Sequence, residues 1–367
     1  MRTRVQPLFS RKITVLSVWA MISVLVIHSK ALSSSSADWN IFIQWFFTRA
    51  LAKWSVPFFF AVSGFWFARS MGEVDCYSFV FGGGAKKLLV KKAKTLLAPY
   101  LLWAVIGTAL GLPLICFNNY VQHRCLWERT VFESGTVWGF INSLFGITVH
   151  APMGNAPLWY VRALLLFFVL APLWVLLLKK VRCLLWVVGA MAVVVPGVSI
   201  GFLPAHYVLG WGWAIVGCLL SEMRFDERQL PRWLLFLCAP VFIALCVSEA
   251  ACQVGWVGVG ELRSWLYMLI PVFGVPTFWI AYDWLCGGDR ELPAWTKWTF
   301  WIYCIHQVFT SYFMSSVLFV LGKSDVVSLI VMLVTPVVGV ALSAVSAIGM
   351  ERTSVKAFQL LTGGRAR

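Results

Sequence analysis

The chain has 367 residues, of which 60% are hydrophobic and only 12% are charged, and it contains 21 Trp and 28 Phe. A water-soluble domain has too little interior to bury so much apolar and aromatic surface, so the composition excludes a soluble globular protein and predicts a polytopic membrane protein. The formal net charge is +15, but Lys and Arg are spread over many short segments between apolar runs. We therefore expect no nucleic-acid partner and attribute the charge to membrane topology and contact with membrane lipid.

Apolar runs of about 17 to 25 residues predict an all-α bundle of about 10 transmembrane helices. No hydrophilic stretch is long enough for a separate soluble domain, so we predict one integral domain over residues 1–367. A cytoplasmic N-terminus places most of the 30 Lys and Arg residues inside, as the positive-inside rule requires. The amphipathic segment from Ile41 to Lys53 is expected to lie in the interface. The predicted spans are 13–31, 54–70, 95–117, 158–178, 183–203, 207–223, 233–252, 264–286, 298–320 and 326–349.

The first predicted span carries an imidazole, His28, near its outer end. A titratable ring at membrane depth is costly unless it faces protein or a wet cavity, so His28 is a candidate functional residue. The alternative is an interfacial histidine that extends toward water. A basic N-terminus followed by an apolar run also suits a cleaved signal peptide, but the further spans favour a retained signal anchor.

Five lysines lie close together at the cytoplasmic entrance of the third predicted span. One interpretation is attraction to the phosphates of lipid headgroups. The other is a polyphosphate ligand that approaches from the cytosol, because ammonium groups bind phosphate as point charges. The five residues are Lys86, Lys87, Lys91, Lys92 and Lys94.

Three later spans also contain polar residues at membrane depth. Ser63 and Gly64 interrupt an aromatic run, which indicates either close helix packing or a polar lining. Arg162 lies about one turn inside the fourth predicted span. His306, near the middle of the ninth, is either a hydrogen-bonding residue of the bundle or a substrate contact.

Several common enzyme signatures are missing from the chain. The 10 cysteines form no C-x-x-C pair and the five histidines form no ligand pair on one helix face, so no metal site is predicted. A disulfide between Cys116 and Cys125 on the outer side stays open. Neither the phosphate-binding loop nor the nucleophile-elbow pattern occurs.

Five motifs in order resemble the acyltransferase family 3 of integral membrane proteins, which O-acylate sugars of cell-surface polysaccharides and related glycans. The chain departs from the family pattern at two points. Eleven positions before the histidine the family has a basic residue and this chain has Ser17, and of the family's R-x-x-R only the first position, Lys92, is basic. The motifs are the apolar run ITVLSVWAMISVLVIHS ending beside His28, FFAVSGF (59–65), KKAKTLLAPY (91–100), LWY (158–160) and IYCIH (302–306).

The resemblance implies a membrane-bound O-acyltransferase acting on carbohydrate, in the bacterial inner (plasma) membrane as a multi-pass protein. It implies acyl-CoA, and acetyl-CoA in particular, as the donor, a glycan as the acceptor, and no tightly bound cofactor. The catalytic residue would be His28, as general base or transient acyl carrier. The donor would contact Ser17, Lys86, Lys87, Lys91, Lys92 and Lys94, and the acceptor would contact Ser63, Trp159, Tyr160, Arg162 and His306.

The longest predicted outer segment runs from Asn118 to Pro157 and contains His123 and His150, so we expect the acceptor to approach there. Two other functions remain open. A secondary transporter or glycan flippase would use helix breaks, for which Gly64, Pro196 and Pro276 are candidates. A catalytically inactive relative of the family would be consistent with the uncharged residue at position 17.

Overall fold

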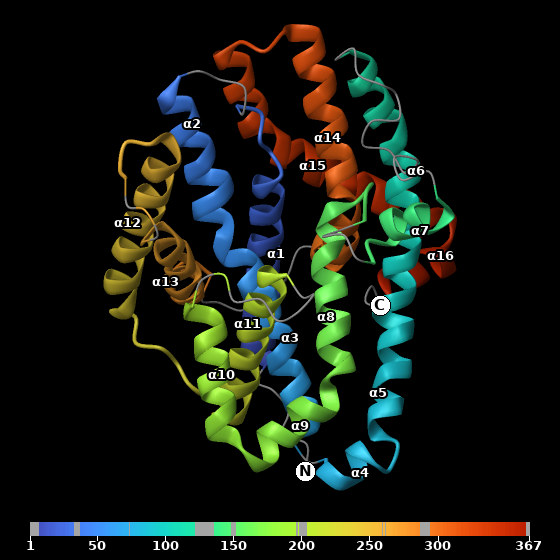
Figure 1. Cartoon of the computed structure of the whole chain (residues 1–367), viewed down its shortest axis with the longest axis vertical. Helices are drawn as coiled ribbons and strands as arrows, with labels where there is room; N and C mark the ends of the chain where they lie inside the picture. Colours follow the sequence, from blue (N-terminus) through green and yellow to red (C-terminus); the bar gives the residue numbers. More distant parts are fainter. Residues whose placement is uncertain are drawn as a thin grey trace. The chain divides into compact units, whose positions relative to one another are not determined.

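In the computed structural model, every regular element among the residues described is a helix (Figure 1). The described residues are 7–32, 37–72, 74–121, 136–147, 152–195, 197, 204–258, 260, 262–286 and 294–364. In this part of the chain seven helices are long and apolar enough to cross a membrane, or eight if one bent pair counts as a span. The predicted class, an all-α polytopic bundle, is confirmed.

The backbone divides into two compact units, of which the first comprises Met1–Lys87 and Val169–Thr296. Within it, α12 and α13 lie side by side, and α3 packs closely against α11. Its helices are α1 (Pro7–Ile27), α2 (Asp38–Trp45), η1 (Phe46–Ala50), η2 (Leu51–Trp54), α3 (Ser55–Met71), α4 (Cys76–Val80), α9 (Ala171–Lys180), α10 (Arg182–Val194), α11 (Ala205–Glu222), η5 (Phe225–Glu227), α12 (Leu234–Val254) and α13 (Leu262–Leu285).

The second unit comprises Leu88–Phe168 and Lys297–Arg367. Here α14 and α15 form a helical hairpin, and α16 packs against α6 (Figure 1). Three helices include residues of both units: α5 (Gly84–Lys92), η6 (Ala294–Trp298) and α8, whose last residue belongs to the first unit. The remaining helices are η3 (Ala93–Leu97), α6 (Ala98–Val121), α7 (Val137–Phe145), η4 (Ala156–Leu158), α8 (Trp159–Val169), α14 (Thr299–Leu321), α15 (Asp325–Thr353) and α16 (Val355–Thr362).

Two predicted spans, at 158–178 and 183–203, differ from the helices observed, whereas a third, at 207–223, corresponds closely to α11. The span at 158–178 is two helices, α8 and α9, that meet at an angle of 59°. Leu170 separates them and Pro172 follows, where proline cannot donate a helical hydrogen bond. The span at 183–203 is helical over the 13 residues of α10 in the part that the structure describes, and the span at 207–223 forms the 18-residue α11.

The prediction that Ile41 to Lys53 lies in the interface is corrected by the structure. These residues belong to one helical run of 34 residues, Asp38–Met71, which is long and apolar enough to cross a membrane. Two polar side chains of this segment are buried: Gln44 is 2% exposed and Lys53 is 8% exposed. An ion pair between Arg49 and the buried Glu249 of α12, with Nε and Oε1 3.1 Å apart, holds the segment against its own unit. The segment is amphipathic, but much of its polar face packs against protein.

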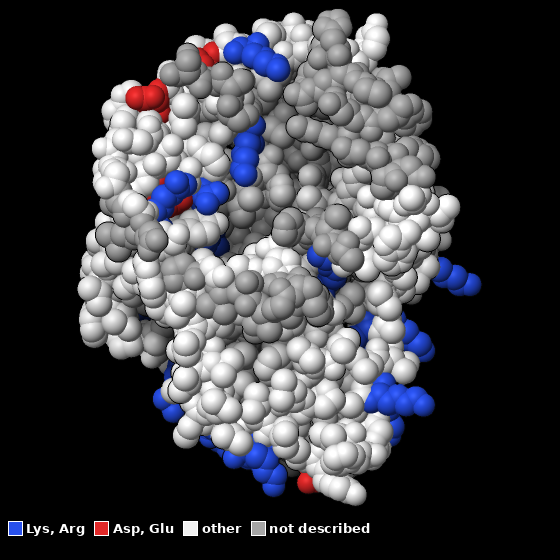
Figure 2. Space-filling model, viewed as in Figure 1, with Lys and Arg blue, Asp and Glu red and all other residues white. Residues whose placement is uncertain are grey.

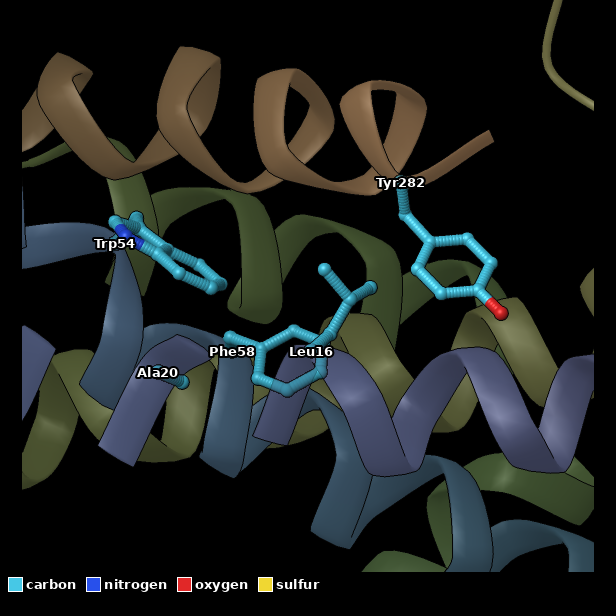
Figure 3. Packing of buried hydrophobic residues seen from close by; sticks show 5 residues of the cluster. All are labelled: Leu16, Ala20, Trp54, Phe58 and Tyr282. Atoms are coloured by element: carbon cyan, nitrogen blue, oxygen red, sulfur yellow. The ribbon is translucent and has the colours of Figure 1, made fainter. Parts of the chain in front are cut away.

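Aromatic packing fixes α1 in the first unit. Trp54 stacks on Phe278 of α13 with ring centroids 4.1 Å apart, and Phe58 lies beside Trp54. Because α1 contributes two side chains to this cluster, its position along the unit is set by large buried groups. Figure 3 shows the cluster, which consists of Leu16, Ala20, Trp54, Phe58 and Tyr282.

Two glycines allow α3 and α11 to approach closely. A Cβ atom at Gly64 would lie 1.8 Å from the carbonyl oxygen of Ala214, and a Cβ atom at Gly217 would lie 1.9 Å from that of Ala61. Small residues at crossing points are the usual means of close packing between helices in membranes. The sequence left two interpretations of Ser63 and Gly64 open, close helix packing or a polar lining. For Gly64 the structure supports close packing.

Gly64→Ala is expected to destabilise the protein by about 1 to 3 kcal/mol, because the added methyl group forces two backbones apart. The matched control is Gly349→Ala in α15, where an added Cβ meets nothing within 4 Å. Alanine favours a helix over glycine by about 1 kcal/mol, so the control should be neutral or stabilising. Thermal unfolding in detergent measures both, and an unchanged midpoint for Gly64→Ala would contradict the packing role.

Candidate functional site

His28 lies in the turn directly after α1, whereas the predicted span placed it inside the helix. Its backbone N–H donates to the carbonyl oxygen of Leu25 at 3.1 Å, and the residue is half-buried. The 21 residues of α1 rise about 32 Å. The imidazole is therefore a membrane thickness away from the start of α1, at the opposite end of the helix.

Ser17 does not replace the basic residue of the family pattern. Its hydroxyl donates to the carbonyl oxygen of Ile13 at 2.7 Å, within its own helix. Lys12, the nearest lysine on α1, binds both carboxylate oxygens of Asp283 at 2.7 Å and lies 4.3 Å from the ring of Trp279. Because the Lys12 ammonium is held in this ion pair, it does not supply the missing charge at position 17.

The lysine cluster forms a cationic helix surface. Lys87 and Lys91 are four residues apart on α5 and so share one face. Lys92 is half-buried, and its ammonium lies 3.7 Å from the ring of Phe168. No acidic residue occurs between Gly84 and Leu97, and Lys86, Lys87, Lys91 and Lys94 are exposed. On the face drawn in Figure 2, Lys and Arg (blue) lie in several separate groups and do not form one continuous basic surface.

Ser63 is half-buried on α3, beside the packing glycine. The first unit also encloses a pocket of about 260 Å³ between α1, α3, α11 and α13. Its lining is apolar and includes Phe9, Phe65 and Trp279 but none of the candidate site residues. This pocket suits hydrocarbon and has no group that could transfer a proton.

In the second unit, two sequence motifs that are far apart in the chain lie together. Trp159, Tyr160 and Arg162 are half-buried in the first turn of α8. The ring of Tyr160 meets the ring of Tyr303 edge-on at 5.9 Å, and the Tyr303 hydroxyl donates to the carbonyl oxygen of Pro157. The LWY and IYCIH motifs therefore form one packed region, as expected for residues of a common site.

His306 is completely buried on α14. Its Nδ1 lies 2.7 Å from the carbonyl oxygen of Tyr303, which only accepts, so Nδ1 donates. Nearby, the amide of Asn155, 1% exposed, donates to the carbonyl oxygen of Cys304 at 2.7 Å. These contacts favour the interpretation of His306 as a hydrogen-bonding residue of the bundle. Asn155 was not predicted, although it directly precedes the APLWY sequence.

The first unit holds a buried charged group that the sequence analysis did not assign to a site. Glu249 of α12 is 0% exposed and receives hydrogen bonds from Arg49 (Nε, 3.1 Å) and Gln253 (Nε2, 2.8 Å). Arg263 Nε lies 3.7 Å from its other oxygen, and Lys53 contacts the ring of Tyr267 nearby. An acidic residue inside the apolar run 233–252 was the available signal, because such a carboxylate requires a cationic partner. We call Arg49, Lys53, Glu249, Gln253 and Arg263 the Glu249 cluster.

The candidate residues divide between the two units. The second unit holds Lys91, Lys92, Lys94, Trp159, Tyr160, Arg162 and His306, and the first holds His28, Ser17, Ser63, Lys86 and Lys87. His123, His150 and Cys125 lie outside the described residues, so the disulfide between Cys116 and Cys125 that the sequence leaves open is not described. Within the described ranges, no group of three or more His, Cys, Asp or Glu residues is placed to hold a metal ion.

Comparison with known proteins agrees with this combination of fold and motifs. A family model with the description "Acyltransferase domain", that of acyltransferase family 3, matches residues 11–349, nearly the whole chain. No curated protein and no solved structure matched the chain. The match includes α1, the lysine cluster and both motifs of the second unit. The chain therefore belongs to the acyltransferase family 3, and it is a membrane protein that carries out acyl transfer.

Proposed function

We propose that this acyltransferase moves an acyl group, most simply acetyl, from cytosolic acyl-CoA to a hydroxyl of a cell-surface or lipid-linked glycan. The reaction takes place at the outer side of the bacterial inner (plasma) membrane, in which the protein is a multi-pass component. The donor is a substrate rather than a resident cofactor. The acceptor is a carbohydrate, so the enzyme is an O-acyltransferase.

The observation that carries this proposal is the distribution of polar groups along α1. The half-buried imidazole of His28 follows the end of the helix, about 32 Å from its beginning, and the residues that precede the helix are basic. In the proposed topology, with a cytoplasmic N-terminus, His28 lies on the outer side. A hydrophilic sugar outside the cell can therefore reach the imidazole without crossing the bilayer.

The exposed lysines of α5 and η3 support a donor that carries phosphate groups. In the proposed complex Lys86, Lys87, Lys91 and Lys94 bind the nucleotide phosphates of acyl-CoA on the cytosolic side. Only the neutral acyl end enters the membrane region, so no phosphate is moved into a low dielectric. Ser17, whose hydroxyl is bonded within α1, contributes at most a polar contact to the pantetheine arm.

The chemical step follows from the imidazole. His28 accepts the proton of the acceptor hydroxyl as its oxygen attacks the thioester carbonyl. A C–O bond forms, the C–S bond breaks, and the CoA thiolate leaves and takes the proton back from His28. Neutral imidazole is regenerated, so the cycle needs no further reactant.

Acceptor contacts are assigned to Ser63, Trp159, Tyr160 and Arg162. Aromatic rings such as Trp159 and Tyr160 bind the apolar faces of sugars, and Arg162 donates hydrogen bonds to their oxygens. Because His306 is fully buried, its contribution is to hold Tyr303 and Tyr160 in place rather than to contact the sugar.

The transporter alternative loses part of its support. Gly64 lies inside the continuous α3 and Pro276 lies inside the continuous α13, so neither is a helix break. Pro196 lies outside the described residues. Broken helices at membrane depth are typical of transporters, so these two positions do not support that function.

A thiol-release assay tests the proposal. Purified full-length protein in lipid nanodiscs is mixed with acetyl-CoA, with and without a glycan extract from bacterial cell envelopes. Release of CoA that requires the extract supports acyl transfer to a glycan. Release without an acceptor would indicate a hydrolase, and no release under either condition would indicate a transporter or an inactive relative.

The Lys87→Gln/Lys91→Gln double variant is expected to raise the KM for acetyl-CoA about 10-fold, because two phosphate contacts are lost at roughly 0.7 kcal/mol each. The maximal rate should change little, since neither lysine meets the reacting atoms. Lys179→Gln/Lys180→Gln at the end of α9, also exposed, is the charge-matched control. Equal effects in both double variants would show that net charge, and not this cluster, attracts the donor.

A further inference from the structure

The Glu249 cluster contains more positive than negative charge. Glu249 is the carboxylate that contacts Arg49 and Arg263, and Lys53 lies beside the same group over the ring of Tyr267. The guanidinium of Arg49 also lies over that ring, at 4.7 Å. The cluster therefore holds three cations and one carboxylate.

The least compensated of these cations is the Lys53 ammonium. Lys53 is 8% exposed, and its Nζ has no hydrogen-bond partner among the described residues. A buried ammonium without such a partner is strongly unfavourable, because it has lost its water and gained only the face of an aromatic ring. A ligand that supplies negative charge would stabilise such an ammonium.

The cluster is open to a ligand on one side. The side chains of Arg49 and Arg263 are 35% and 38% exposed, whereas that of Glu249 is 0% exposed. An anion could thus reach the two arginines from outside and contact Lys53 beneath them. Arginine and lysine together are the usual donors to carboxylate and phosphate oxygens.

The cluster is connected to the end of α1 that bears His28. Lys30, two residues after the histidine, lies 5.6 Å from the ring of Trp45, and Arg49 lies 5.3 Å from the same ring. The pKa of Lys30 is lowered, mainly because its ammonium is partly buried and to a smaller extent because Arg49 repels it. The excess positive charge therefore extends from Lys53 to the segment that carries the proposed base.

We propose that Lys53, Arg49 and Arg263 form a binding site for one anionic oxygen group, a carboxylate or a phosphate, of the acceptor. The inference rests on the proposed function and narrows it: the acceptor is an acidic or phosphate-bearing glycan. An anionic lipid headgroup offers the same chemistry, and the experiment separates the two sources. The site lies in the first unit, in the same unit as His28.

The test measures thermal unfolding of the full-length protein in phosphatidylcholine nanodiscs with sodium glucuronate, sodium phosphate, or sodium chloride at equal ionic strength. Glucuronate or phosphate should raise the midpoint by about 2 to 4 °C over chloride. Lys53→Met should have a higher midpoint than wild type in chloride, because an uncompensated buried charge is removed, and should show no response to either anion. Lys180→Met, exposed on α9, should keep the wild-type response.

Arg263→Gln, whose side chain is partly exposed, is a second variant that should weaken the anion response even if Lys53→Met fails to fold. The absence of an anion response in wild type, or the same response in Lys53→Met, would overturn the site. If phosphatidylglycerol in the nanodiscs raises the midpoint and removes the response to glucuronate, the group belongs to lipid and the acidic acceptor is wrong. The thiol-release assay is independent, so CoA release without an anion response refutes this inference and leaves the acyltransferase proposal intact.

Discussion

His28→Ala is expected to lower the rate of acceptor-dependent CoA release by about 10²- to 10⁴-fold, the usual contribution of a general base. Methyl in place of imidazole leaves no group to accept the proton of the attacking hydroxyl. Because His28 is only half-buried and follows the end of α1, the variant should fold and insert normally. The measurement is the thiol-release rate at matched protein amounts.

The control for this variant is His206→Ala, which removes a half-buried imidazole from α11 in the same unit. It should retain most of the activity. Rapid quenching of the wild-type reaction separates the two possible roles of His28: a base leaves no acyl-enzyme, whereas a carrier accumulates one. Acceptor acylation at the wild-type rate in His28→Ala would remove this residue from the chemistry.

Glu249→Gln should destabilise the protein by about 3 to 5 kcal/mol, which is the usual effect of removing one partner of a buried ion pair. The carboxylate is 0% exposed and contacts Arg49 and Arg263. With an amide at this position, those arginines and Lys53 would be left with no negative group among their described contacts. The expected result is a large decrease in the thermal midpoint in detergent or nanodiscs.

Glu351→Gln makes the same chemical change in a more exposed ion pair, where Glu351 accepts from Lys297 at 2.9 Å. Solvent screening limits such a pair to at most about 1 kcal/mol. The two carboxylate-to-amide variants should therefore differ clearly in midpoint. Equal, small decreases would show that the Glu249 cluster is hydrated and carries no unbalanced charge.

Local hydropathy was sufficient to predict the class of the fold. Apolar runs such as 233–252 and 326–349 correspond to α12 and α15, because a long, predominantly apolar helix is determined by its own residues and by the bilayer. The order of short motifs was likewise enough to indicate the family. Both properties depend on neighbouring residues in sequence, so no tertiary contact was needed to predict them.

Tertiary contacts decided which polar helix faces are buried against protein. An amphipathic segment such as 41–53 has the same pattern whether it faces lipid headgroups or protein, and the partner of Arg49, Glu249, lies 200 residues away. For the same reason the packing role of Gly64 became visible only with Ala214 of α11 placed against it.

The sequence by itself therefore determined the membrane-embedded helical fold, the family, and the candidate residues from His28 to His306. Only the tertiary structure decided that His28 follows α1 in a turn, that Lys12 is paired with Asp283, and that two arginines contact the buried Glu249. The physical reason is the distance along the chain between the residues that interact. The hydropathy of a span depends on residues that are neighbours in sequence, whereas the balance of buried charges depends on side chains that folding brings together from distant parts of the chain.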